Sequence, residues 1–227
     1  MGFDDEADIV RLSLSAAWSL IDRSHGLRGP VTHAIEHDGR LYVATSVGLH
    51  GAVREASGAT RLAVIGLAQT EVNHLLSTPV GMLVAAREGV YLWRENALHA
   101  VTSETVAWRL VPSKVVPDRI YVVEDAGMRV LDRQGDGFLA GQRFSDPSFR
   151  FDEIAEEADG SLWIDRLLAD PVRLRMQSDG RTLGEPEPVD LAGRRKADES
   201  AAVLKIDGVI MVATEAALLA WDGHTLT

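Results

Sequence analysis

A short glycine-containing pattern recurs through the chain at intervals of about forty residues and constrains the fold more than any other feature. The pattern occurs at 45–52, 86–93 and 124–131, where the central glycines are Gly48, Gly89 and Gly127. A fourth copy at 214–221 has Ala217 in place of the glycine, and a weaker copy lies at 171–174. A period of this length indicates one supersecondary unit repeated along the chain.

Tight-turn signals precede apolar runs in most copies. These signals are Asp38-Gly39, Gly81, Asp159-Gly160 and Asp207-Gly208, while Pro117-Asp118 stands at the corresponding place in the third copy. Asp-Gly supplies the positive φ that a two-residue hairpin needs. A second turn signal follows each block, so every unit is predicted to contain four short antiparallel strands. In the first unit these strands are predicted at 31–36, 41–45, 49–54 and 60–66.

Four-stranded antiparallel units repeated at this spacing are typical of β-propeller blades. We therefore predict an all-β, single-domain β-propeller over 1–227, with little helix and about five blades. The blades are predicted at 31–70, 71–105, 106–148, 149–198 and 199–227. A β-sandwich would also fit the regular strand spacing, but the repeated glycine register favours the propeller.

One further motif set indicates a family. His25-Gly26-Leu27 is followed by Asp38-Gly39, by Leu41-Tyr-Val-Ala-Thr45 and by Gly48-Leu49, and the stretch 158–164 repeats the middle of this motif. The pattern resembles the two-component regulator propeller repeat. This resemblance implies the sensory portion of a bacterial signalling protein, which normally precedes a kinase or cyclase module. The repeat motif is structural, so the resemblance carries over no catalytic residue.

The last unit ends at 225–227, before an outermost strand could be completed. The segment 16–22 has a composition suited to that strand and could close a five-bladed ring by pairing there. An unpaired edge would otherwise expose backbone donors and acceptors. The alternative is that the chain forms part of a propeller with six to eight blades.

Composition excludes several classes of function. The chain has 23 Lys and Arg against 34 Asp and Glu, a net charge of −11, which disfavours nucleic acid and anionic membrane surfaces as partners. There is no cysteine, hence no disulfide and no thiolate. Neither a signal peptide nor an apolar run long enough to insert in a membrane is visible. A complete chain of this kind would be expected in the cytoplasm.

Recurrent histidines and tryptophans are expected to pack rather than to bind. His33 and His74 occupy equivalent positions in adjacent units and should not converge on a metal, while Trp93, Trp163 and Trp221 are predicted to fill the core between blades. No hydrolase, metalloprotease or nucleotide-binding motif is present. We therefore predict no metal and no cofactor.

Loops at one end of the central channel are the predicted binding site, because propeller ligands usually meet such loops. The candidate ligand-binding residues are Arg28, Glu71, Asp125, Arg150, Asp165, Arg166, Arg194, Arg195 and Glu215. Their mixed charges favour a non-enzymatic module that senses a small polar or sugar-like ligand or binds a protein partner. One alternative is a glycan-active hydrolase or lyase using two of Glu71, Asp146, Asp165 and Glu199. Another is a structural module of a larger signalling protein.

Overall fold

The computed structural model describes residues 9–11, 19–56, 58, 60–103, 105–149, 154–191 and 193–227. The chain forms two compact units, which are described separately. The first contains residues up to Leu110 together with Gly135–Gly137, and the second contains Val111–Gln134 and Phe138–Thr227. The prediction of a single domain with five repeat units stays a prediction.

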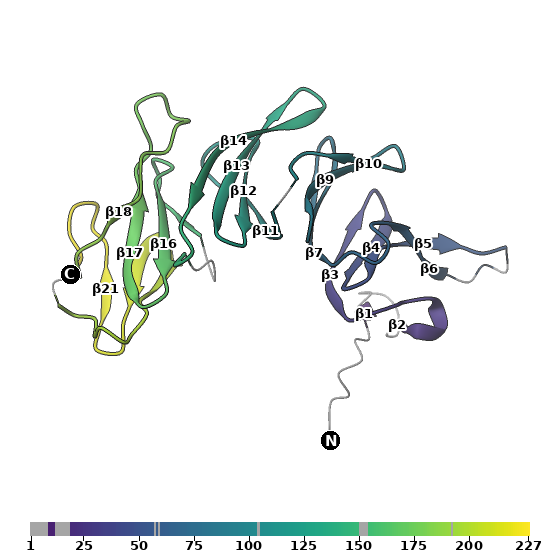
Figure 1. The fold of residues 1–227 in the computed structure, drawn as a ribbon, viewed down its shortest axis with the longest axis horizontal. Helices are drawn as coiled ribbons and strands as arrows, with labels where there is room; N and C mark the ends of the chain where they lie inside the picture. The colour runs from purple at the N-terminus through teal and green to yellow at the C-terminus, as the bar shows by residue number, and fades with distance from the viewer. Residues whose placement is uncertain are drawn as a thin grey trace, which may run out of the picture. The chain divides into compact units, whose positions relative to one another are not determined.

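The first unit contains two four-stranded antiparallel sheets and a small two-stranded sheet (Figure 1). The four-stranded sheets are β3(Val31–His37), β4(Arg40–Thr45), β5(Gly48–Arg54) and β6(Thr60–Gly66), and then β7(Val72–Thr78), β8(Gly81–Ala86), β9(Gly89–Arg94) and β10(Ala97–Ala100). The two-stranded sheet pairs β1(Ile9–Arg11) with β2(Ser19–Ile21), and a 3-10 turn, η1(Arg23–His25), follows. No helix in the described part of the chain has the length and apolar character needed to cross a bilayer.

The second unit continues the same architecture. Its first sheet is formed by β11(Ala107–Pro112), β12(Arg119–Glu124), β13(Gly127–Gln134) and β14(Gly137–Ser145), although the start of β11 belongs to the first unit. The next sheets are β15(Ala155–Glu156), β16(Leu162–Arg166), β17(Ala169–Leu174) and β18(Glu187–Pro188), and the three-stranded β19(Ala202–Ile206), β20(Val209–Ala213) and β21(Leu218–Ala220). The prediction of an all-β fold built from four-stranded antiparallel sheets is therefore confirmed.

Hairpin turns connect the strands where the sequence predicts them. The four strands predicted for the first unit agree with β3–β6 to within one residue at each end. Asp38 and Gly39 have φ values of 49° and 70°, and Asp207 and Gly208 have φ values of 50° and 85°. Positive φ at both central residues gives the turn the twist of the flanking strands.

The recurring glycine has a steric cause. Gly89 and Gly127 begin the third strand of their sheets with φ values of 135° and 142°. A Cβ atom on Gly89 would lie 2.3 Å from the carbonyl oxygen of Thr102, and one on Gly127 would lie 1.9 Å from that of Phe144. Only glycine allows the backbone at or just after the end of the outermost strand to approach this closely.

Two apolar layers stabilise the first unit. One contains Tyr42, Leu49, Leu75 and Trp93 and lies between the two four-stranded sheets. The other contains Val43 and Leu62 and is covered by Leu27, with Ile21 packed beside it.

The segment predicted to close the ring makes a different pairing. Ser19–Ile21 pairs with Ile9–Arg11 in its own sheet, and the predicted pairing of residues 16–22 with the last unit is not observed among the described residues. Residues 16–18 lie outside them. At the other end of the chain, Leu226 forms a bridge with Trp221, and Thr227 exchanges two backbone hydrogen bonds with Ala220. The C-terminal residues thus pair with the segment 220–221 at the end of the last described strand.

The sheets of the second unit also pack through their apolar faces. Tyr121, Met128, Ile164 and Leu174 belong to one core cluster, and Trp163 belongs to the next one. Trp163 is fully buried and meets the ring of Trp221 edge to face at a centroid distance of 5.1 Å. The recurrent tryptophans therefore pack between sheets.

Candidate ligand-binding pocket

Among the described residues, the predicted site residues of the first unit share no contact with one another. Arg28 is exposed after η1; burial lowers the pKa of His50, and the charge of Arg28 adds a smaller contribution in the same direction. Glu71 precedes β7, and its carbonyl oxygen accepts a hydrogen bond of 2.9 Å from the backbone of Arg87. Arg150 lies outside the described residues.

Several predicted residues of the second unit come together in one polar network. Arg166 Nε donates to the carbonyl oxygen of Asp170 at 2.8 Å, and Arg195 Nε donates to the carboxylate of the same Asp170 at 2.7 Å. Arg166 Nη1 also lies 3.8 Å from Asp146 Oδ2. Arg166 and Arg195 are thus linked through Asp170.

The same network extends to Glu215. Its carboxylate pairs with Lys196 Nζ at 2.6 Å, and its backbone N–H donates to Glu199. Arg195 Nη1 donates to the carbonyl oxygen of Glu199 at 2.8 Å. Arg194 is exposed and donates to the carbonyl oxygen of Leu226 at 3.3 Å.

The other predicted residues of this unit are Asp125, which is exposed in the turn between β12 and β13, and Asp165, which is buried on β16. The network therefore joins three of the predicted residues, Arg166, Arg195 and Glu215. The side chains of all three already bind other groups of the protein.

The carboxylates considered for hydrolysis are also engaged by the protein. Asp146 Oδ1 accepts hydrogen bonds from the backbone and hydroxyl of Ser148 at 2.8 and 2.6 Å. Glu199 accepts backbone hydrogen bonds from Glu215 and Lys196, which lower its pKa. A carboxylate held in its charged form is poorly suited to act as a general acid. Glu71 belongs to the first unit, whereas Asp146, Asp165 and Glu199 belong to the second.

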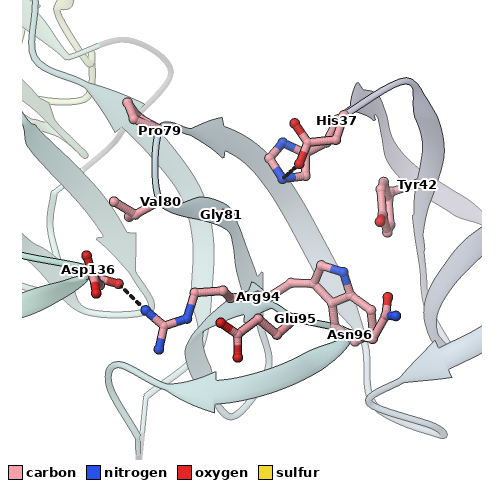
Figure 2. A pocket seen from close by; sticks show the side chains of 11 residues that line it. His37, Tyr42, Pro79, Val80, Gly81, Arg94, Glu95, Asn96 and Asp136 are labelled. Atoms are coloured by element: carbon pink, nitrogen blue, oxygen red, sulfur yellow. Dashed lines mark hydrogen bonds and ion pairs between the residues drawn. The ribbon is translucent and has the colours of Figure 1, made fainter.

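The first unit contains a pocket of about 510 Å³ near the hairpin turns (Figure 2). This volume falls within the roughly 300–1,000 Å³ typical of small-molecule sites. Its lining consists of His37, Asp38, Tyr42, Pro79, Val80, Gly81, Trp93, Arg94, Glu95, Asn96 and Asp136. These residues come from the end of β3 and the turn after it, from β4, from the start of β8 and the turn before it, and from the end of β9 and the turn after it, with Asp136 added from residues 135–137. The pocket lies at the opposite strand ends from the predicted loops.

Buried rings form the inner wall of the pocket. Tyr42 and Trp93 are 5% and 6% exposed and meet edge to face at a centroid distance of 6.4 Å. The guanidinium of Arg40 lies 5.4 Å from the centroid of the Tyr42 ring. His37 is also buried, and its Nδ1 lies 2.8 Å from Ser77 Oγ, while Nε2 lies 3.5 Å from Asp38 Oδ2. Packing from both sheets therefore fixes the wall.

Charged groups form the rim. Arg94 Nη1 donates to the carbonyl oxygen of Asp136 at 2.8 Å, as Figure 2 shows, while its buried Nε has no hydrogen-bond partner among the described residues. The side chain of Asp38 is 89% exposed. Within the part of the chain that the structure describes, the Glu95 carboxylate has neither an ion-pair nor a hydrogen-bond partner. The rim thus holds charge that is not used for internal pairing.

Sequence reasoning missed this pocket. Asp38, Glu95 and Asn96 were read only as turn formers, and all three have positive φ, at 49°, 52° and 61°. The available signal is the position of Asp38 and Glu95 in turns of adjacent units, directly after His37 and Arg94.

The recurrent histidines stack instead of converging on an ion. The rings of His33 and His74 lie 4.1 Å apart with an interplanar angle of 26°, and Leu75 N donates to His33 Nδ1 at 3.3 Å. Within the described ranges no three histidine or acidic side chains are placed to hold a metal ion.

The sequence matches no protein-family model and no curated protein. Solved structures of similar fold include the extracellular domain of a candidate one component system from B. thetaiotaomicron, with a TM-score of 0.55 and 11% identity over 87% of this chain and 27% of that one. PorZ, a surface component of the type-IX secretion system of Porphyromonas gingivalis, has a TM-score of 0.52 and 13% identity, over 98% of this chain and 30% of PorZ. A candidate 6-phosphogluconolactonase from Bacteroides fragilis has a TM-score of 0.53 and 12% identity, over 87% of this chain and 68% of that one.

These likenesses define a class by fold alone. The chain is an all-β protein with a propeller-like fold, similar to the extracellular domain of a bacterial signalling protein. It spans less than a third of the length of the first two structures. The number of blades stays a prediction.

Proposed function

We propose that this chain is a non-enzymatic binding module and that a small polar ligand occupies the pocket of the first unit. The observation that carries the proposal is a hollow of about 510 Å³ with a buried aromatic wall and a charged rim. Apolar surface with a few convergent polar groups is the usual composition of a ligand site.

The contrast with the predicted loops supports this location. The side chains of Arg166, Arg195 and Glu215 are engaged by neighbouring groups of the protein, so a ligand would have to displace existing bonds. Among the residues that the structure describes, Asp38 and Glu95 have no such partners beyond the long contact of Asp38 with His37. The loop residues nevertheless stay a prediction for a protein partner.

A signalling role fits the comparisons. One protein of similar fold is described as the extracellular domain of a candidate one component system, and a ligand-binding module would serve as the input part of such a system. The second candidate function is lactone or glycan hydrolysis. It is favoured by the fold shared with a candidate 6-phosphogluconolactonase and by the contact of His37 with Asp38 at the pocket.

A ligand panel tests the proposal. The chain is screened by thermal shift against sugars, amino sugars, amino acids and organic acids, and compounds that raise the melting temperature are titrated by calorimetry. Val80→Tyr fills the pocket with an aromatic ring, whereas Val209→Tyr adds the same ring to an exposed strand of the second unit. We expect saturable binding by the wild type and by Val209→Tyr, and loss of binding by Val80→Tyr.

Two outcomes would overturn the proposal. One is that no compound in the panel binds, or that binding persists unchanged in Val80→Tyr. The other is turnover of a lactone or glycoside that is lost in His37→Gln or Asp38→Asn, which would establish the enzymatic alternative.

A further inference from the structure

We propose that the ligand of this pocket carries a positively charged amine. This inference rests on the proposed function, because it assigns a chemical class to the ligand of the same pocket. It is carried by two features together, the charge of the rim and the aromatic wall behind it.

The rim has more acidic than basic groups. Asp38, Glu95 and Asp136 line the pocket, and Arg94 is the one arginine or lysine among the lining residues. The Arg94 guanidinium already donates to the carbonyl oxygen of Asp136. An anionic ligand would therefore meet uncompensated carboxylates, whereas an ammonium group would form charge-assisted hydrogen bonds with them.

The carboxylate of Glu95 is the expected contact point for the charged amine of the ligand. Glu187, by contrast, pairs with Arg175 at 2.7 Å. Glu95 follows Arg94 in sequence, yet its carboxylate has no ion-pair partner within the described ranges. Positive φ at Glu95 and Asn96 holds this turn at the mouth of the pocket. The Glu95 carboxylate is thus available to an incoming cation.

The wall favours an organic cation over a metal ion. Calcium requires six to eight oxygen ligands and magnesium a near-octahedral set, and no group of three acidic or histidine side chains in the described part of the chain is placed to hold a metal. Tyr42 and Trp93 instead line the pocket with apolar ring carbon atoms. An alkylammonium can place its carbon atoms against this apolar surface while its charge meets the carboxylates.

Matched ligands test the inference. Glucosamine and glucose differ in one ammonium group, so they are titrated by calorimetry in parallel with putrescine and the anion gluconate. We expect at least one of the two ammonium compounds to bind about tenfold more tightly than glucose, since one charge-assisted hydrogen bond has roughly that effect. This preference should decrease at high ionic strength, and gluconate should bind most weakly.

Isosteric variants locate the effect. Glu95→Gln should reduce the preference for the ammonium compound to within about twofold of glucose, because the charge is lost while the shape is kept. Asp38→Asn should weaken it less. Asp207→Asn changes the equivalent hairpin turn of the second unit, where φ is nearly the same as at Asp38, and should leave the preference unchanged.

The outcomes separate the two proposals. If panel compounds bind in the pocket but no ammonium compound is preferred over glucose, or if Glu95→Gln keeps the preference, this inference is wrong and the proposed function stands. If neither the ammonium compounds nor the rest of the panel bind, the proposed function fails and this inference fails with it.

Discussion

The two units differ in whether their buried polar groups have hydrogen-bond partners. In the second unit, Glu156 accepts hydrogen bonds from Ser113 Oγ, Lys114 N and Tyr121 Oη at 2.5, 2.7 and 2.9 Å, and buried Glu124 binds two arginines. In the first unit, both ring nitrogens of His50 and Nδ1 of His74 are buried with no partner among the described residues.

This difference indicates that the two units have different roles. Buried polar groups normally find partners, and networks of satisfied groups make a packed interior rigid and specific. The second unit follows this rule at Glu124, whose partners lie in the same sheet, and at Glu156, which links two neighbouring sheets. The first unit leaves groups unsatisfied and also contains the pocket with its unpaired rim, so we assign binding to the first unit and a structural role to the network of the second.

The largest expected effect on the free energy of unfolding comes from replacing Glu157. Its carboxylate accepts hydrogen bonds from Trp163 Nε1 at 2.7 Å, from Arg173 Nε at 2.5 Å and from Trp221 Nε1 at 3.2 Å. Glu157→Ala leaves the Arg173 charge without its partner and should lower the free energy of unfolding by about 3–5 kcal/mol. Urea unfolding measures this change.

A matched exposed pair provides the control for Glu157. Glu187 pairs with Arg175 at 2.7 Å, but both side chains are more than half exposed, so Glu187→Ala should cost less than about 1 kcal/mol. Equal losses in the two variants would show that the network of the second unit has no special role in stability.

The next effect concerns acid stability of the first unit. Burial, with smaller contributions from the charges of His33 and Arg109, lowers the pKa of His74 to about 4, whereas a histidine in an unfolded chain has a pKa of about 6.5. Between these values the unfolded chain binds a proton that the native protein does not. The free energy of unfolding should therefore fall as pH decreases from 6.5 to 4, by about 2–3 kcal/mol from this residue.

Unfolding at several pH values isolates the contribution of His74. His74→Gln removes the titrating group, so its stability should depend less on pH in this range than that of the wild type. His99→Gln, at an exposed position on β10, serves as the control and should keep the wild-type pH dependence. The same slope in His74→Gln and the wild type would contradict the prediction.

These two regions also show what the sequence could and could not predict. Strands β3–β6 and their turns follow from alternation, Asp-Gly pairs and the recurring glycine, all of which act within a few residues. Glu156 was not singled out, because its donors Ser113 and Tyr121 lie in the preceding sheet. The pocket was missed for the same reason, since its lining gathers only when turns of neighbouring sheets pack together.

A smaller and opposite effect is expected at His50. This residue is fully buried, and neither ring nitrogen has a partner among the described residues. Replacing an unsatisfied buried polar group with an apolar one of similar size removes a desolvation cost, so His50→Leu should raise the free energy of unfolding by about 1 kcal/mol. A loss of stability in urea would mean that the imidazole has an essential interaction in solution.

The smallest effect is expected in the exposed part of the polar network. Lys196 and Glu215 form an ion pair of 2.6 Å, but their side chains are 67% and 64% exposed. Lys196→Ala should leave the midpoint of urea unfolding unchanged within error, because solvent screens such pairs. A clearly lower midpoint would show that this loop contributes to the stability of the second unit.

The most direct test of the account is to locate the bound ligand by NMR. The labelled chain is titrated with the tightest-binding compound of the panel, and shifts of the backbone amides are mapped onto both units. The account predicts that saturable shifts concentrate at His37, Asp38 and Arg94–Asn96. Shifts concentrated instead at Arg166, Arg195 and Glu215 would contradict it and place the binding site in the loops of the second unit.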